Sequence, residues 1–180
     1  APSYRNVIRH EWVASTGYGR SPGQSFTNCA YSIWECDKLY DFGVISSDKD
    51  EPIHLRIKYI ISELRKIILE EQINFVVLEG LSMGGIPSVS ARSLAALFYC
   101  IELLCEDEGV SFENIPPKSV KKVWTGSGNA SKKDMEEACP EGLLNKIMLS
   151  KHKTLASGRR DLVDSFAIYK SYCELIRDKI

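Results

Sequence analysis

The sequence has no uninterrupted apolar run long enough to cross a bilayer as a helix. Its first thirty residues mix Arg, His, Glu, Ser and Gly, so we expect no secretory signal there. None of its six cysteines forms a Cys-x-x-Cys pair, and no Cys/His cluster has the spacing of zinc ligands. These absences favour an intracellular protein with reduced cysteines over a secreted, membrane or zinc-binding one.

A strong charge of either sign is also absent, because 23 basic and 24 acidic residues give a formal net charge of −1. This balance argues against a protein that binds nucleic acid by charge alone. Two local basic stretches remain, and together they could hold a phosphate backbone, although each alone is as readily a solvated face. They consist of Lys118, Lys121, Lys122, Lys132 and Lys133, and of Lys151, His152, Lys153, Arg159 and Arg160.

The first half of the chain predicts a hairpin, a helix and a buried strand. Apolar and aromatic residues at 28–34 and 39–45 indicate two strands joined by a turn. Apolar residues recur at helical spacing over 53–71. The short apolar run at 74–78 is typical of a strand covered on both faces.

The second half predicts further helices and one more strand. A helix over 88–105 is apolar around much of its circumference, which indicates either deep burial or a subunit contact. A strand over 110–114 precedes a helix that Pro116-Pro117 opens. Ser131 and Asp134 resemble a capping box, Pro140 is expected to end that helix, and a last helix runs from 161 to about 178. We expect one domain over residues 1–180, an α/β fold with helices on both faces of a mixed sheet.

Three carboxylates stand out by position. Glu79 ends the buried strand, where an acid is poorly solvated unless it has a partner or a cation. Asp161 and Asp164 share one face in the first turn of the last helix. Each alone is readily explained as a strand-end or helix-start acid. Together they would form a hard oxygen site suited to Mg²⁺ or Mn²⁺.

Several segments occur in an order that resembles a known family. They are Ser21-Pro22-Gly23 followed by Thr27, the strand end Val76-Val77-Leu78-Glu79, the apolar helix 88–105, Val120-Lys121 with Thr125-Gly126-Ser127-Gly128 and Lys132, and Asp161-Leu162-Val163-Asp164-Ser165. In this order they resemble the RuvC-type Holliday junction resolvases of the ribonuclease H-like superfamily. The resemblance extends from about Ser21 to Tyr172.

The resemblance implies a Mg²⁺- or Mn²⁺-dependent endonuclease that cuts four-way DNA junctions, with two metal ions held by Glu79, Asp161 and Asp164. It places Lys121 and Lys132 near the scissile phosphate, and it implies a homodimer through the 88–105 helix, in a cytoplasmic or organellar protein. The DNA-binding candidates are Lys118, Lys121, Lys122, Lys132, Lys133, Arg159 and Arg160.

One departure from the family falls at its first aspartate, which corresponds to Ser21 here. The preceding segment is small, polar and glycine-rich, so residues 7–13 could form the first strand instead. The chain could be an inactivated junction binder, Glu11 could replace the lost acid, or three acids could hold enough metal for weak activity. Because charge stabilisation dominates such catalysis, we expect severely impaired cleavage.

Three other functions compete with this interpretation. A non-catalytic junction-binding protein on the same fold is favoured by Ser21, and a different ribonuclease H-like nuclease would prefer RNA–DNA hybrids. A nucleotide-binding domain of the actin or hexokinase type would need a longer chain with two lobes.

Overall fold

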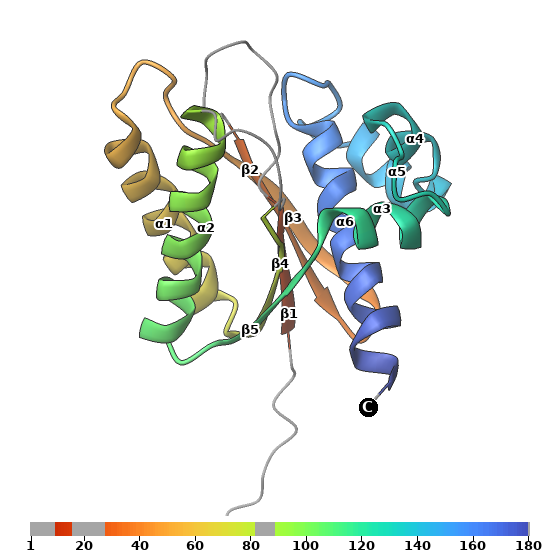
Figure 1. Cartoon of the computed structure of the whole chain (residues 1–180), viewed down its shortest axis with the longest axis horizontal. Coiled ribbons are helices and arrows are strands. Elements are labelled where there is room, and N and C mark those ends of the chain that lie inside the picture. The colour runs from red at the N-terminus through yellow and green to blue at the C-terminus, as the bar shows by residue number, and fades with distance from the viewer. Residues whose placement is uncertain (1–9, 16–27, 82–88, 180) are drawn as a thin grey trace, which may run out of the picture.

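A five-stranded mixed sheet forms the centre of the computed structural model, which describes residues 10–15, 28–81 and 89–179 (Figure 1). The strand order is β3-β2-β1-β4-β5. β1 pairs antiparallel with β2 and parallel with β4, β2 pairs antiparallel with β3, and β4 pairs parallel with β5. The strands are β1 His10–Ser15, β2 Asn28–Glu35, β3 Lys38–Ser46, β4 Ile73–Glu79 and β5 Ser111–Ile115.

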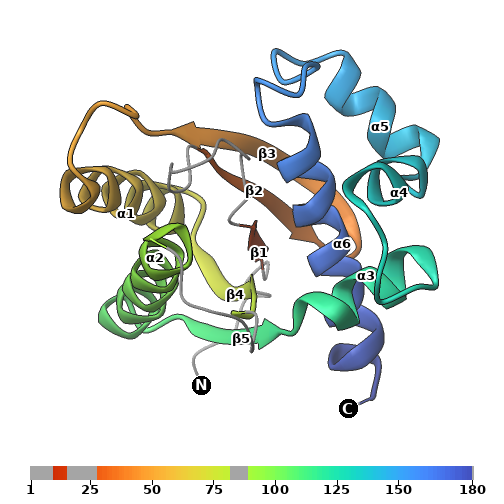
Figure 2. The same ribbon diagram turned by 45° about the horizontal axis from the view of Figure 1, so that its top comes forward.

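Helices cover both faces of this sheet, as Figures 1 and 2 show. One face carries α1 (Ile53–Glu70) and α2 (Val89–Asp107). The other carries the long α6 (Arg159–Leu175), which a short 3-10 turn at Arg177–Lys179 follows, with α3, α4 and α5 beside it. These are α3 (Pro117–Thr125), α4 (Lys132–Glu137) and α5 (Glu141–Met148). The predicted α/β class, a mixed sheet between two helical layers, is confirmed.

Side chains along each strand point alternately to the two faces of the sheet, so the buried residues form two cores. In β2, Cys29 and Ile33 pack with α1 and α2, whereas Ala30 and Trp34 pack with α6. On the α6 side, Phe166 is fully buried and meets Trp34 edge to face, with ring centroids 5.7 Å apart. α6 is therefore fixed against the sheet along its length, which determines where its first turn lies.

Local sequence explains the boundaries of several elements. Cys36 and Asp37 both adopt positive φ, the geometry of a tight two-residue hairpin turn. Pro117 begins α3, where its missing N–H costs nothing. Ser131 and Asp134 form the predicted capping box of α4. No described helix is long and apolar enough to cross a membrane.

One sequence-based expectation needs correction, and the structure locates the first strand. Pro140 does not end the helix that begins after Ser131, because that helix already ends at Glu137; Pro140 instead precedes α5, an element that the sequence analysis did not predict. The first strand lies at His10–Ser15, close to the alternative at 7–13, so it ends well before Ser21.

Candidate active site

Glu79 stands at the end of β4 on the face that α6 covers. Phe75 and Val77 belong to the core on that side, so alternation directs Glu79 the same way. The backbone N–H of Gly80 donates to the carbonyl of Ile115 (2.7 Å), which extends the β4–β5 pairing just past the glutamate. The strand end is thus fixed on the side of β5, and the carboxylate is partly buried.

Asp161 and Asp164 lie one turn apart on α6, with fully buried Leu162 and Ser165 packing beside them. Asp161 is only 7% exposed. Its carboxylate accepts a hydrogen bond from the side chain of Asn28, the first residue of β2. Asn28 was not among the predicted site residues, because a single polar residue at a strand start carries no signature in the sequence.

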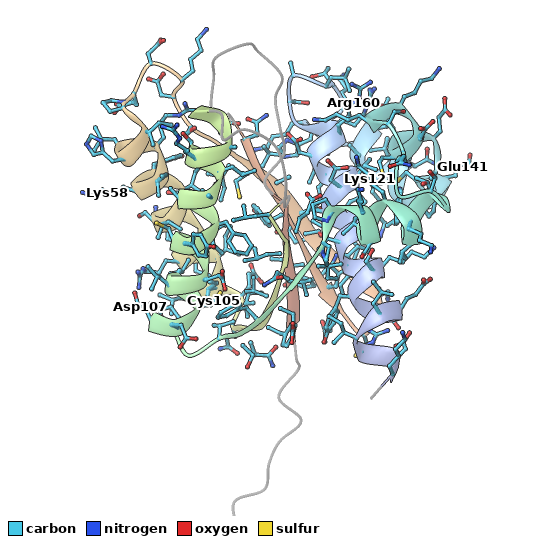
Figure 3. All side chains as sticks on the ribbon, viewed as in Figure 1. Lys58, Cys105, Asp107, Lys121, Glu141 and Arg160 are labelled. Atoms are coloured by element: carbon cyan, nitrogen blue, oxygen red, sulfur yellow. The ribbon has the colours of Figure 1, made fainter. Side chains whose placement is uncertain are left out.

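A cavity of about 140 Å³ brings together residues from four elements. It is lined by Glu79 of β4, Lys121 of α3, Lys132 and Met135 of α4, and Asp164 of α6, with Pro117 and Val120 completing its wall. Figure 3 shows Lys121 on the α6 side of the molecule. Four of the five predicted catalytic residues therefore meet in one place, and Asp161 lies one helical turn from Asp164.

Burial raises the pKa values of these three acids, and mutual repulsion contributes to the shift of Asp164. Burial raises the pKa of Glu79 to about 7, although Lys121 and Lys132 oppose the shift. Burial, followed by the charges of Glu79 and Asp161, holds the pKa of Asp164 well above its usual range. Burial also raises the pKa of Asp161, against the effects of Lys132 and Asn28. Carboxylates with insufficient compensating charge are the expected state of a site that binds a cation.

The donor set fits a hard divalent cation, since it consists of carboxylate oxygens. Among the described residues, no three His, Cys, Asp or Glu side chains gather closely enough to surround one ion. Asp164 instead interacts with both Glu79 and Asp161. The arrangement is an open one, in which solvent or a phosphate oxygen would complete the coordination of an ion.

The resemblance implies a fourth acid at the position of Ser21. Ser21 lies outside the described residues. Backbone pairing joins Ala14 of β1 to Leu78 of β4, so Ser15 follows at the level of Glu79. Glu11 pairs with Phe75, four residues back, which is about 13 Å along a strand. The backbone of residue 11 therefore lies well back from the end of β4 that carries Glu79.

The predicted DNA-binding residues fall into three groups. Lys121 and Lys132 line the cavity, whereas Lys118, Lys122 and Lys133 are exposed. Arg159 and Arg160 form ion pairs with Glu136 of α4, with nitrogen–oxygen distances of 2.5 and 3.3 Å. The two arginines therefore have a partner inside the protein, which the sequence analysis did not anticipate.

A known protein family matches most of this sequence. The family model for crossover junction endodeoxyribonuclease RuvC matches residues 19–154. The chain belongs to the RuvC family. The predicted family is therefore confirmed.

Individual RuvC proteins are similar to this chain in sequence. RuvC from Rickettsia akari is 30% identical over 137 residues, which cover 76% of this chain and 81% of the relative. RuvC from Brachyspira hyodysenteriae is 28% identical over 121 residues, covering 65% and 74%.

Solved structures confirm the RuvC fold. Thermus thermophilus RuvC superimposes with a TM-score of 0.63 at 17% identity, covering 93% of this chain and 96% of that one. The same protein in complex with a Holliday junction substrate gives 0.63 at 15%. The yeast mitochondrial Holliday junction resolvase Ydc2 gives 0.53 at 14%, covering 89% and 76%.

The RuvC match does not include every residue of the site. It begins at residue 19, beyond β1, and ends at residue 154, before Asp161 and Asp164. The assignment of the two aspartates therefore rests on their place in the structure and on the resemblance of their segment.

Proposed function

We propose that this chain recognises four-way DNA junctions through an active site built for metal-dependent phosphodiester hydrolysis. The observation that carries this proposal is the cavity where Glu79 and Asp164 meet Lys121 and Lys132 in a RuvC-family fold. The end of β4 and the helices α3, α4 and α6 meet there, although they are far apart in the sequence.

The residues divide the chemistry between them. Glu79, Asp161 and Asp164 would together hold Mg²⁺ or Mn²⁺ ions, which would supply an activated water and would stabilise the leaving oxygen. Lys121 and Lys132 bring positive charge to the same cavity, where an ammonium group can bind a phosphate oxygen and offset developing negative charge. The shape of the junction and its phosphates, more than base edges, would select the substrate.

Cleavage by this chain is expected to be weak because one carboxylate is missing. The sequence contains no Asp or Glu between Glu11 and Glu35, so neither Ser15 nor Ser21 has an acid directly beside it in the chain. A serine hydroxyl is neutral and is a poor substitute for a carboxylate that bridges two ions. This observation favours a second candidate function on the same surface, a junction-binding protein that cuts slowly or not at all.

The exposed lysines would contact the DNA around the cavity. Lys118 and Lys122 lie one turn apart on α3, and Lys133 lies beside Lys132 at the start of α4. Each such contact adds affinity that falls with salt concentration. The formal charge of −1 then reflects acids elsewhere and not the absence of a phosphate-binding surface.

A homodimer through α2 would match the two-fold symmetry of a four-way junction. Leu97, Ile101 and Leu104 bury one side of this helix in the core. Tyr99 and Leu103, one turn apart on the outer side, are 58% and 62% exposed. Such large apolar side chains on an outer helix face are suited to contact a second copy.

A paired assay on a synthetic four-way junction tests this function. Binding would be followed in Ca²⁺ and single-turnover cleavage in Mg²⁺ and Mn²⁺, for the unmodified chain and for Ser15→Asp and Ser21→Asp. Ser15→Asn is the matched control, because it changes size without adding charge.

We expect the unmodified chain to bind the junction and to cut it very slowly. The β1–β4 register predicts that Ser15→Asp increases cleavage by orders of magnitude, whereas Ser15→Asn does not. Rescue by Ser21→Asp instead would favour the alignment implied by the sequence. Binding without rescue by either variant would establish the junction-binding alternative, and a normal cleavage rate in the unmodified chain would refute the missing-ligand hypothesis.

A further inference from the structure

The short helix α4 carries two charged residues of opposite sign on one face. Lys132 and Glu136 are four residues apart, so they lie one above the other on the helix surface. Lys132 lines the cavity with Glu79 and Asp164. Glu136 instead contacts the beginning of α6, which Figure 2 shows beside α4.

Both carboxylate oxygens of Glu136 are engaged by α6. Arg159 Nε lies 2.5 Å from Oε1, and Arg160 Nε lies 3.3 Å from Oε2. The Glu136 side chain is only 17% exposed, so solvent screens these contacts less than those of a surface pair. Arg159 also donates through Nη1 to the carbonyl oxygen of Lys153 (2.8 Å), which ties the preceding loop to the same point.

Glu136 adds negative charge at the start of α6, beside that of Asp161 in the first turn. Its N-cap is Gly158, which contributes no side-chain hydrogen bond to the helix, and its first two residues are arginines. The N-terminal end of a helix is already positive, so Arg159 and Arg160 add an unfavourable charge there. The Glu136 carboxylate offsets it, in the same helical turn that leads into Asp161 and Asp164.

A helix of six residues does not hold its position unaided. Buried Met135 accepts a hydrogen bond from Trp124 Nε1 through its carbonyl oxygen (2.7 Å), which joins α4 to α3. Met135 also packs in the same buried core as Leu162 and Phe166 of α6, and the Glu136 ion pairs add a charged link between the two helices. Loss of Glu136 would therefore leave α4 packed in this core and remove the charged contact that fixes the helix face carrying Lys132 against the first turn of α6.

We propose that Glu136 is a positioning residue that holds Lys132 beside the acidic residues by tying α4 to the first turn of α6. The inference rests on the proposed metal site. It also assigns Arg159 and Arg160 to this internal link and away from the DNA phosphates.

The test is a double-mutant cycle read by Mn²⁺ affinity, which requires no cleavage. Lys132→Met removes a positive charge next to the acids, so it should tighten Mn²⁺ binding by about fivefold. In the Glu136→Gln background, Lys132 is no longer held there, and Lys132→Met should change the affinity less than about twofold. Glu136→Gln has nearly the same volume and should retain the fold by circular dichroism.

Glu137→Gln is the matched control, because Glu137 lies on the same helix, is 64% exposed and pairs only with exposed Lys133 among the ion pairs described. In that background Lys132→Met should again tighten binding about fivefold. An equal effect of Lys132→Met in all three backgrounds would overturn the inference, as would no effect in the unmodified chain. Failure of the unmodified chain to bind Mn²⁺ would remove the proposed metal site itself.

Discussion

Replacing Glu79 with Gln should stabilise the metal-free protein at alkaline pH, although it removes a residue of the proposed active site. Burial raises the pKa of the Glu79 carboxyl to about 7, from an ordinary value of 4.5. Between these two values the folded state binds a proton that the unfolded state has lost. The contribution of Glu79 to the free energy of unfolding is therefore fully present below pH 4.5 and is lost as the pH rises through 7.

The difference between the ordinary and the raised pKa of Glu79 sets the size of its effect on the free energy of unfolding. Each pKa unit corresponds to about 1.4 kcal/mol, so a shift from 4.5 to about 7 sets an upper limit near 3.5 kcal/mol. Glu79 is partly exposed, and solvent reduces the value. We expect Glu79→Gln to raise the free energy of unfolding by about 2 kcal/mol at pH 8 and by little at pH 4.5. For a chain of this size, that corresponds to roughly 4–8 °C in Tm.

Urea denaturation in EDTA at pH 4.5 and pH 8 measures this difference. Glu113→Gln, at an exposed position of the neighbouring strand β5, is the control and should change the free energy of unfolding by less than about 0.5 kcal/mol. Saturating Mn²⁺ should make the unmodified chain the more stable protein at pH 8, because only this chain retains the proposed ligand Glu79. A Glu79→Gln protein that is less stable at both pH values would show that the ionised Glu79 carboxylate does not destabilise the metal-free fold.

Two further predictions concern the dimer and the lysines. Leu103→Asp should convert a dimer to a monomer in light scattering, whereas Leu69→Asp, similarly exposed on α1, should not; a dimer that persists in the Leu103→Asp variant would exclude the α2 interface. In the Ser15→Asp background, Lys121→Met should slow single-turnover cleavage by at least about tenfold with little change in junction affinity. Lys122→Met should instead weaken junction binding and lower the salt slope by about one; equal effects of the two variants on binding would contradict their assignment to cavity and surface.

Elements with strong periodic or apolar patterns could be predicted from the sequence. The helical spacing over 53–71 and the apolar run at 74–78 correspond to α1 and β4. Prediction failed where the local signal was weak or ambiguous. α5 is only eight residues long, and the proline before it is as compatible with the end of one helix as with the start of the next. β1 contains His and Glu beside its apolar residues, so its position was left open.

In the candidate site, too, some residues could be predicted from the sequence and others could not. Glu79, Asp161 and Asp164 could be named because each stands at a recognisable element boundary within an ordered set of motifs. The partners of these residues could not be named. Glu136 meets Arg159 across 23 positions of sequence, and Asn28 reaches Asp161 from the opposite end of the chain. Such contacts arise from tertiary packing, and no local pattern of residues specifies them.

The missing acid is the clearest case in which sequence and structure complement each other. The order of motifs implies Ser21 as its position, whereas pairing of Ala14 with Leu78 brings Ser15 level with Glu79. The sequence has no Asp or Glu between residues 11 and 35, so the carboxylate is missing whether its position is Ser15 or Ser21. A carboxylate is lacking at either position.

Recognition of four-way junctions by this chain can be measured by comparing its affinity for a junction and for a linear duplex of the same arm sequence. Both titrations would be made in Ca²⁺ at one stated salt concentration, with an RNA–DNA hybrid as a third substrate. We predict that the junction binds at least about 100-fold more tightly than either linear substrate. Equal affinity for junction and duplex, or a preference for the hybrid, would show that the chain does not select four-way junctions.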